Sequence, residues 1–282
     1  MKILVTGYTG QLGYDLVNEG TKQGFTMFGV GSESLDITKR NEVISYIEQL
    51  NPDAIIHCAA YTAVDKAEDD KDFCWKVNVI GTKNLVDVAK KIGVKFLYVS
   101  TDYVFDGKGE SPFKETDKTD PVNYYGLTKL EGEKIVQRIT EGFVVRTSWV
   151  FGINGNNFVK TMLRLAESHN EVNVVGDQIG SPTYTYDLAK LLLEMIQSET
   201  YGIYHATNEG ICSWAEFAEE IFKQSHNDVL VNVIPTKDFP TRAARPKNSR
   251  LSKEKLKHNG FTPLPKWQDS LAYYLNMLKH EV

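Results

Sequence analysis

The chain has 282 residues, of which 41% are apolar and 24% are charged, as in ordinary soluble globular proteins. Its 32 basic and 37 acidic residues give a net charge of −5 without a basic block, which argues against nucleic acid or an anionic membrane as a partner. The N-terminus becomes strand-like at once, without a long apolar segment, so we expect no signal peptide, and no run of about 18 apolar residues predicts a membrane span. Three scattered cysteines (Cys58, Cys74 and Cys212) form no C-x-x-C pair, so we expect a cytoplasmic protein without a disulfide framework or zinc site.

Short apolar strands alternate with helices through the first 150 residues. Strands are predicted at 2–6, 25–30, 54–60, 95–100 and 143–148, and helices at 11–24, 40–50, 72–93 and 124–139. Apolar strands that alternate with helices of this length are typical of a parallel sheet covered on both faces. The sequence therefore predicts an α/β fold with a Rossmann-type doubly wound parallel sheet.

The second half is less regular. Helices are predicted at 157–167, 186–197, 213–224 and 266–279, and a half-exposed strand at 229–234. Ser213, followed three residues later by Glu216, matches a capping box at the start of a helix. We expect residues 151–282 to form a smaller α+β region that mainly binds substrate, with segments such as 184–200 packing back on the first domain. This region would form one wall of a cleft beyond the carboxyl ends of the strands.

Three glycines follow the first strand and open the first helix. Gly7 allows the tight turn, Gly10 lets a pyrophosphate approach the backbone, and Gly13 allows the helix to pack closely on the strand. The N–H groups at the helix start then bind the phosphates. A bare strand–helix turn is the alternative, but the position of the glycines directly after an N-terminal strand favours a dinucleotide site. Residues 1–150 are therefore predicted to be an NAD(P)-binding Rossmann domain.

The acidic residue that usually ends the second strand of such a domain is not obvious. Glu33 is offset from the strand end, and Asp36 lies in a segment that we expect under the adenine, with a surface acid as the alternative. No arginine lies beside the glycine loop to hold a 2′-phosphate, although Arg40 is within reach. The residues leave the choice between NADH and NADPH open.

Two adjacent tyrosines begin the helix predicted at 124–139. Tyr125 and Lys129 are four residues apart and share a helix face, whereas Tyr124 is one residue out of phase. A lysine ammonium beside a tyrosine favours the phenolate and lowers its pKa from about 10, which suits general acid–base catalysis. The alternative is a packed tyrosine and a solvated lysine, because such spacings also arise by chance.

The context favours the catalytic interpretation. Ser100, Thr101 and Asp102 follow a central strand, at the edge of the sheet to which the next helix brings Tyr125. A threonine hydroxyl there would hydrogen-bond a carbonyl oxygen while the tyrosine donates a proton, as hydride addition to a ketone requires. A strand-end hydroxyl satisfied by backbone is the alternative for Thr101.

At this point the sequence resembles the extended short-chain dehydrogenase/reductase family. The resemblance rests on TGxxGxxG, HCAA, VN, STDYVF and YxxxK. Longer motifs resemble the dTDP-4-dehydrorhamnose reductases within that family: GQLG, AAYTAVDKAE, YYGLTKLEGE, RTSWVFG, NFVKTML, DQIGSPTYT and RPKNSRL. The resemblance covers nearly the whole chain. It implies reduction of the C4 keto group of a dTDP-sugar, with NADPH as the reductant and NADH as a possible alternative.

The resemblance also implies roles for individual residues. Tyr125 would donate the proton to the C4 oxygen, Lys129 would bind the nicotinamide ribose and lower the pKa of that tyrosine, and Thr101 would orient the sugar. The other residues that it implies are Gly10, Gln11, Leu12 and Gly13 at the phosphates, Asp36 and Ile37 at the adenine, Ala59, Ala60, Tyr61 and Thr62 at the ribose, Asp102 and Trp149 at the sugar nucleotide, and Asn78 as the family's helix asparagine.

Cations and metals are harder to assign. Arg242, Arg245 and Lys247 lie in a proline-rich loop that either binds a diphosphate or is simply solvated, and Arg245 is the best single candidate. The segment Asp177–Tyr184 is either a substrate loop or a plain turn. The six histidines show no metal spacing, so no metal site is predicted. Some members of the family that the sequence resembles bind Mg²⁺ through acids at a homodimer contact, and Asp15 is the nearest matching acid in this chain. The sequence leaves open whether the chain forms a homodimer.

Two alternative functions remain. One is a related nucleotide-sugar epimerase or dehydratase. Dehydratases of the family carry an Asp-Glu pair where this chain has Asp102 and Tyr103, while no single residue excludes an epimerase. The other is a catalytically silent NADP-binding regulatory subunit, against which the intact set of Thr101, Tyr125 and Lys129 argues.

Overall fold

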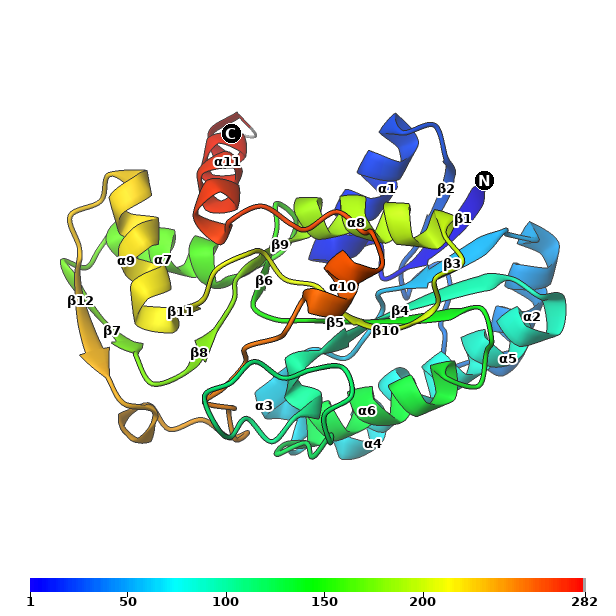
Figure 1. Ribbon diagram of the computed structural model, residues 1–282, viewed down its shortest axis with the longest axis horizontal. Helices are drawn as coiled ribbons and strands as arrows, with labels where there is room; N and C mark the ends of the chain where they lie inside the picture. The colour runs from blue at the N-terminus through cyan, green and yellow to red at the C-terminus, as the bar shows by residue number, and fades with distance from the viewer. Residues whose placement is uncertain (281–282) are drawn as a thin grey trace.

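The computed structural model describes residues 1–280. Its centre is a six-stranded, all-parallel sheet with the strand order β10-β5-β4-β3-β1-β2 (Figure 1). The strands are β1 (Lys2–Thr6), β2 (Thr26–Val30), β3 (Ala54–His57), β4 (Lys95–Thr101), β5 (Gly142–Thr147) and β10 (Gly202–His205). The predicted α/β fold with a parallel doubly wound sheet is thus confirmed.

Helices cover both faces of this sheet, as Figure 1 shows. One face packs on α1 (Gln11–Lys22) and α8 (Thr185–Gln197), whose leucines share a buried cluster with β1, β3 and β5. The other face packs on α2 (Arg40–Leu50), α5 (Thr82–Ile92) and α6 (Tyr124–Val136). Burial on both faces explains why the strands are almost continuously apolar.

The order of the strands reverses between β1 and β3. β1 is followed by a connection to β2 on one side, and β3 leads to β4 on the other. Ligands of open parallel sheets bind beyond the carboxyl ends of the strands at such a switch point. The loops that follow β1 and β3 are therefore the place where a dinucleotide is expected.

The structure differs from the prediction in two places within the Rossmann-type part. The helix predicted at 72–93 consists of α4 (Lys71–Trp75), a π-helical segment η1 (Lys76–Gly81) and α5. Strand β10 was not predicted; it comes from the second half of the chain and pairs with β5, so the sheet includes residues beyond position 150. A short helix, α3 (Val64–Ala67), precedes α4, and a 3-10 turn, η2 (Asp102–Val104), follows β4.

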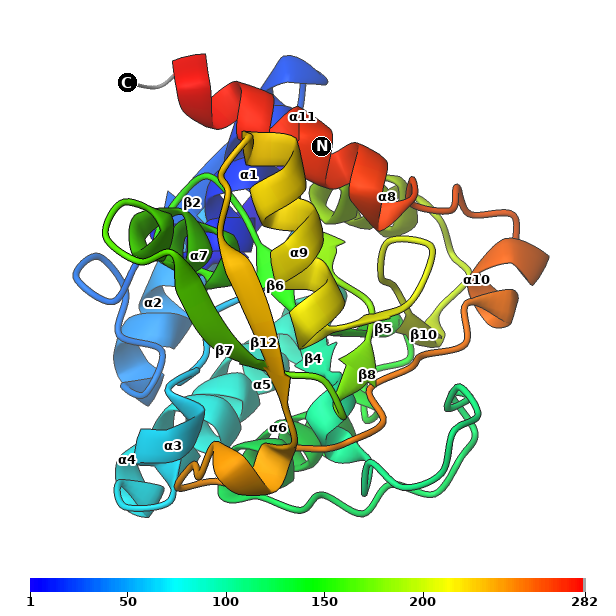
Figure 2. The same cartoon turned by 90° about the vertical axis from the view of Figure 1, so that its left-hand side faces the viewer.

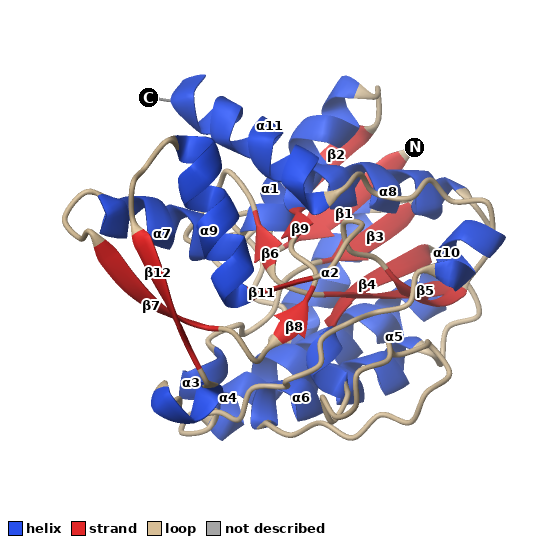
Figure 3. Cartoon of the chain, turned by 60° about the vertical axis from the view of Figure 1, so that its left-hand side comes forward, coloured by secondary structure: helices blue, strands red, loops and turns tan. Residues whose placement is uncertain are grey.

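The remaining elements pack beside the sheet around an aromatic-rich core that includes Phe151, Phe217, Trp267 and Tyr274 (Figures 2 and 3). They are α7 (Phe158–Ala166), α9 (Trp214–Ser225), α11 (Trp267–His280), α10 (Glu254–His258), η3 (Thr236–Asp238) and the short strands β6 (Val150–Phe151), β7 (Glu171–Val175), β8 (Ile179–Gly180), β9 (Thr183–Tyr184), β11 (Cys212–Ser213) and β12 (Leu230–Ile234). The predicted capping box of Ser213 and Glu216 is present. None of the helices within residues 1–280 is long and apolar enough to cross a membrane.

Candidate active site

The glycine loop lies against the segment that follows β3. Gly7 has a φ of +73°, and a Cβ placed on it would lie 2.6 Å from the backbone nitrogen of Ala59. A Cβ on Gly13 would lie 2.3 Å from the carbonyl oxygen of Gly7. Helix α1 begins after Gly10 with no acid in its first turn and no side-chain cap from the described chain. Its first N–H groups, with the positive end of the helix dipole, suit a phosphate.

The segment after β2 is fixed by a local turn. The Asp36 carboxylate accepts hydrogen bonds from the Thr38 hydroxyl (2.7 Å) and backbone N–H (3.0 Å), which hold the pKa of Asp36 below its usual range. Ile37 is buried against Gly81 of the π-helical segment. Arg40 forms an exposed ion pair with Asp87 at 2.8 Å. The adenine candidates Asp36 and Ile37 are thus held in place, whereas Arg40 already has a carboxylate partner.

Residues Ala59, Ala60, Tyr61 and Thr62 form the loop after β3, and Asn78 holds that loop. The Asn78 amide oxygen accepts from the Tyr61 backbone N–H at 2.7 Å, and its nitrogen donates to the Tyr61 carbonyl (3.2 Å) and the Thr128 hydroxyl (2.9 Å). The side chain is 1% exposed. Asn78 therefore connects the loop after β3 to α6 through the π-helical segment.

Tyr125 lies at the carboxyl end of β4, beside Thr101. The Thr101 side chain lies beside the Tyr125 phenol, and the Tyr125 ring meets the Tyr103 ring edge-on with centroids 6.0 Å apart. Asn123 caps α6 by accepting from the Gly126 N–H at 2.8 Å. Burial raises the pKa of Tyr125 well above its usual value, and the nearby Asp102 carboxylate raises it further, against a smaller lowering by the Thr101 side chain.

Lys129 is 3% exposed and packs on β4. Its ammonium donates to the carbonyl oxygen of Val99 at 2.7 Å and lies 4.0 Å from the centroid of the Tyr98 ring. Burial lowers the pKa of Lys129 to about 7. The expected lowering of the pKa of Tyr125 by this lysine is not what the structure shows, because burial dominates both groups.

Asp102 is a buried acid next to this pair. Its carboxylate accepts from the Thr101 hydroxyl at 3.0 Å and from the Ser249 hydroxyl, and burial raises its pKa to about 6. Ser249 comes from the segment after the proline-rich loop and was not predicted as a site residue. The single clue in the sequence was its place within the motif RPKNSRL.

The predicted substrate residues from the second half lie around the same end of the sheet. The Trp149 ring stacks on Trp214 with centroids 3.8 Å apart, and its backbone has a φ of +50°. Arg245 forms an ion pair with Asp65 at 2.6 Å and lies near Tyr103, whose ring meets that of Tyr125 edge-on. Arg245 is thus linked to Tyr125, the candidate acid, through one residue, Tyr103.

Comparison with known proteins supports the resemblance found in the sequence. The family model described as "RmlD substrate binding domain" matches residues 1–280. A dTDP-4-dehydrorhamnose reductase of Aggregatibacter actinomycetemcomitans is 42% identical, over 96% of this chain and 97% of that protein. The chain belongs to the dTDP-4-dehydrorhamnose reductase family.

Solved structures agree with this assignment. The crystal structure of a dTDP-4-dehydrorhamnose reductase from Clostridium acetobutylicum has a TM-score of 0.97 and 42% identity, covering 99% of this chain and 100% of that one. That of Bacillus anthracis, in complex with NADP, has a TM-score of 0.95 and 41% identity, covering 98% and 100%. A UDP-glucose 4-epimerase of Thermus thermophilus, at 19% identity and a TM-score of 0.86, shares the fold.

Three other candidate residues have polar partners of their own within the chain. Asp15 is buried on α1, where it accepts a hydrogen bond from Thr185 of α8. Arg242 and Lys247 form exposed ion pairs with Asp69 and Asp177. Within residues 1–280 no group of three or more His, Cys, Asp or Glu side chains could hold a metal ion.

Proposed function

We propose that this chain reduces the C4 keto group of dTDP-4-dehydro-L-rhamnose to give dTDP-L-rhamnose, with NADPH as the reductant. The observation that carries the proposal is the position of the Tyr125 phenol beside Thr101 at the carboxyl end of β4, in a family named for this reduction. A carbonyl oxygen placed against this pair would receive a proton from Tyr125 and, once the Thr101 hydroxyl turns from Asp102, a hydrogen bond from Thr101.

The residues present fit a dinucleotide. The N-terminus of α1, from Gln11 to Gly13, would hold the pyrophosphate; Asp36 and Ile37 would flank the adenine; the loop 59–62 would line the ribose. When bound, the nicotinamide supplies the hydride. The Bacillus anthracis relative in complex with NADP supports NADPH over NADH. Because Cys58, Cys74 and Cys212 are free thiols, as suits a reducing compartment, we propose the cytoplasm as the site of the reaction.

Tyr125 has the protonation state that reduction needs. A raised pKa keeps its phenol protonated at neutral pH, so it enters the reaction as an acid. As the C4 carbonyl becomes an alkoxide, Tyr125 would give its proton to that oxygen and afterwards be reprotonated from solvent. Thr101, fixed by Asp102, would orient the oxygen. Lys129 would turn from the Val99 carbonyl to the nicotinamide ribose and stabilise the transient phenolate.

We also propose a division of labour along the chain. Residues 1–150 would bind the cofactor, and residues 151–282 mainly the sugar nucleotide, with α8 and β10 belonging structurally to the sheet. Arg245, from the proline-rich loop, would bind the diphosphate of the substrate, since an arginine fork suits phosphate oxygens. Trp149 would pack on the sugar nucleotide.

The test is a panel of 4-keto nucleotide sugars, each incubated with NADPH or NADH while the reduced cofactor is followed spectroscopically. We expect stoichiometric oxidation of NADPH with dTDP-4-dehydro-L-rhamnose and slower turnover with other sugars. Turnover of the sugar with no net change in NADPH would favour the epimerase alternative. No turnover of any sugar, with NADPH binding intact, would favour the silent subunit.

A further inference from the structure

A buried ion pair joins the active-site helix to the sheet. Arg146 of β5 donates from Nε to one carboxylate oxygen of Glu133 (2.9 Å) and from a terminal nitrogen to the other (2.7 Å). Both side chains are almost fully buried, at 3% and 0% exposure. Such a fork is specific in geometry, but burying two charges is costly, and an apolar pair of similar volume often serves stability as well.

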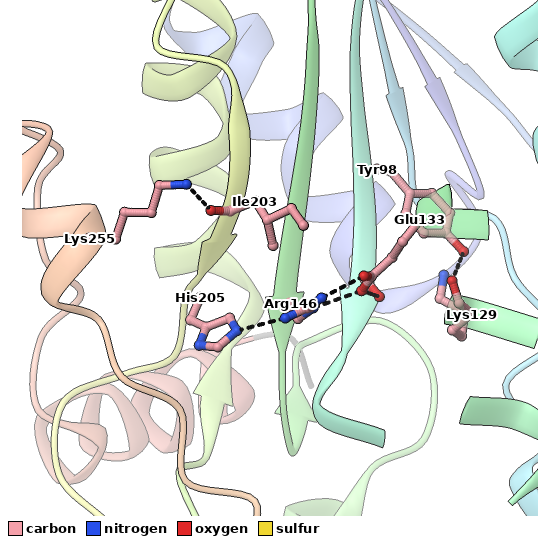
Figure 4. Close-up of polar contacts among 8 residues, drawn as sticks. Tyr98, Lys129, Glu133, Arg146, Ile203, His205 and Lys255 are labelled. Carbon is pink, nitrogen blue, oxygen red and sulfur yellow. Dashed lines mark hydrogen bonds and ion pairs between the residues drawn. The ribbon is translucent and has the colours of Figure 1, made fainter. Parts of the chain in front are cut away.

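The strand register explains how this pair is built. Ser100 of β4, Arg146 of β5 and His205 of β10 are direct register partners on adjacent strands. The Ser100 hydroxyl donates to Glu133 at 2.6 Å, and Arg146 contacts the ring nitrogen of His205 at 3.3 Å (Figure 4). Burial lowers the pKa of His205 to about 3, so its ring is neutral and can accept from the guanidinium. The row lies one residue before Thr101.

Glu133 also shares a helix face with Lys129, one turn earlier on α6. Tyr98, two residues before Ser100, contacts Lys129 twice: its ring lies under the ammonium at 4.0 Å and its hydroxyl donates to the Lys129 carbonyl at 3.4 Å. A Cβ on Gly132 would lie 2.3 Å from the Tyr98 hydroxyl. Two adjacent turns of α6 are thus fixed on alternate residues of β4, one through Lys129 and one through Glu133.

We propose that Glu133 and Arg146 are positioning residues for the reaction: the pair holds Lys129 against β4 and favours the charged form of its side chain. The kinetic part of this inference rests on the function proposed above. The structural part concerns Lys129 alone and stands independently of the substrate.

The charges around Lys129 support the proposal that the ion pair favours the charged form of this lysine. The ionisable groups that face it come from β3 and its following loop, α4, β4 and α6: His57, Cys58, Cys74, Tyr98 and Glu133. Burial leaves the first four neutral at pH 7, because it lowers the pKa of His57 to about 3 and raises those of Cys58, Cys74 and Tyr98. Among these groups Glu133 is therefore the anion that favours the charged form of Lys129.

Substitution of Glu133 and substitution of Arg146 should shift the titration midpoint of Lys129 in opposite directions. Glu133→Gln removes the anion and leaves Arg146, so the pH at which Lys129 loses its proton should fall by about one unit or more, a tenfold change in its protonation constant. Arg146→Gln leaves the anion unpaired, so the same midpoint should rise. The double variant avoids a buried unpaired charge, and its midpoint should lie between those of wild type and Glu133→Gln.

The midpoint can be followed by NMR of lysine Cε signals, with Lys129→Met identifying the resonance. Asp187→Asn is the matched control, since Asp187 accepts from Asn208 and Ser270 in another polar network, between α8 and α11; it should leave the midpoint unchanged. If a single variant does not fold, the double variant decides. Midpoints of Glu133→Gln and the double variant equal to wild type would overturn the proposal and leave a purely structural ion pair.

The kinetic arm uses the same variants. With dTDP-4-dehydro-L-rhamnose and NADPH, the alkaline fall of kcat/KM should move to lower pH in Glu133→Gln and stay in place in Asp187→Asn. A wild type that reduces no sugar would refute the proposed function but leave the NMR result standing. Shifted midpoints without a shifted rate profile would show that Lys129 is positioned by the pair but not used in the reaction.

Discussion

The ammonium of Lys129 lies 2.7 Å from the carbonyl oxygen of Val99, two residues before the strand-end threonine beside which Tyr125 lies. The lysine and the tyrosine are one helical turn apart, yet they have different partners on the same strand. The two side chains therefore have different surroundings, which the Y-x-x-x-K spacing alone does not reveal. The phenol lies beside Thr101, and the lysine, one turn away, is bound to the backbone of β4, from which we propose that it turns to the cofactor.

Replacing the phenol should abolish catalysis and leave the cofactor site intact. We expect Tyr125→Phe to lower kcat for sugar reduction by about 10²–10⁴-fold, the usual contribution of a general acid. The dissociation constant for NADPH, measured by fluorescence titration, should stay within about twofold. Tyr124→Phe is the matched control, because Tyr124 lies on the neighbouring helix position with Lys71 over its ring. A fully active Tyr125→Phe, or an inactive Tyr124→Phe, would assign the acid elsewhere.

The proposed diphosphate contact predicts a loss of substrate affinity. Arg245→Met should raise KM for the sugar nucleotide about tenfold or more, since a charge-assisted bond to phosphate is worth roughly 1.5–3 kcal/mol. Arg242→Met removes a similar ion pair, with Asp69, but one whose side chains are 65% and 58% exposed, so it should change KM less than twofold. Equal effects of the two variants would show that the loop acts only through its net charge.

Substitutions of two glycines in the loop after β1 should have different effects on stability and on cofactor binding. A methyl group on Gly13 would meet the Gly7 carbonyl oxygen at 2.3 Å, so Gly13→Ala should destabilise the fold by about 1–3 kcal/mol in urea denaturation. The nearest atom to a methyl group on Gly10 is at 3.3 Å, so Gly10→Ala should keep most of its stability. It should nevertheless bind NADPH about tenfold more weakly, because the methyl group stands where the pyrophosphate approaches. Normal NADPH affinity in Gly10→Ala would move the phosphate site away from this residue.

The buried lysine makes stability depend on pH. The pKa of Lys129 is about 7 in the fold against 10.5 for an unperturbed lysine, so between these values the unfolded chain binds more protons. Wild-type stability should therefore rise relative to Lys129→Met by up to about 1.4 kcal/mol per pH unit from about pH 7 toward pH 10. Below pH 7 both states are protonated and the difference should be constant. Urea denaturation of both proteins across this range measures it; a difference independent of pH would mean that the lysine stays charged in the fold.

Local pattern was enough to predict most of the sheet and its helices. The strands β1, β4 and β5 are mostly buried apolar runs with clear ends, β2 is a half-buried run, and the predicted helix at 40–50 matches α2. Strand β10 was missed because its four residues carry little pattern of their own, and its place is determined by pairing with β5, some sixty residues earlier. The π-helical segment was missed because its apolar spacing reads as ordinary helix; what distinguishes it is the Asn78 contact to Tyr61.

The residues of the candidate site also fall into those that the sequence predicts and those that only the tertiary structure reveals. Thr101, Tyr125 and Lys129 were predictable from spacing and strand position, and the structure places all three on or against β4. Ser249 was not predictable as a partner of Asp102, because only the tertiary fold brings the two together. Arg146 and Glu133 were not predicted either, although a charge inside an otherwise apolar parallel strand indicates that a buried partner is needed; only the structure shows that Glu133 is that partner.

The central claim is hydride transfer to the C4 carbon with NADPH as the donor. The most direct measurement is the incubation of dTDP-4-dehydro-L-rhamnose with NADPH deuterated at the transferable C4 position, followed by NMR and mass analysis of the sugar. The account predicts one deuterium at C4 of dTDP-L-rhamnose for each NADPH oxidised. Sugar that is converted without deuterium, while the reduced cofactor is unchanged, would contradict it.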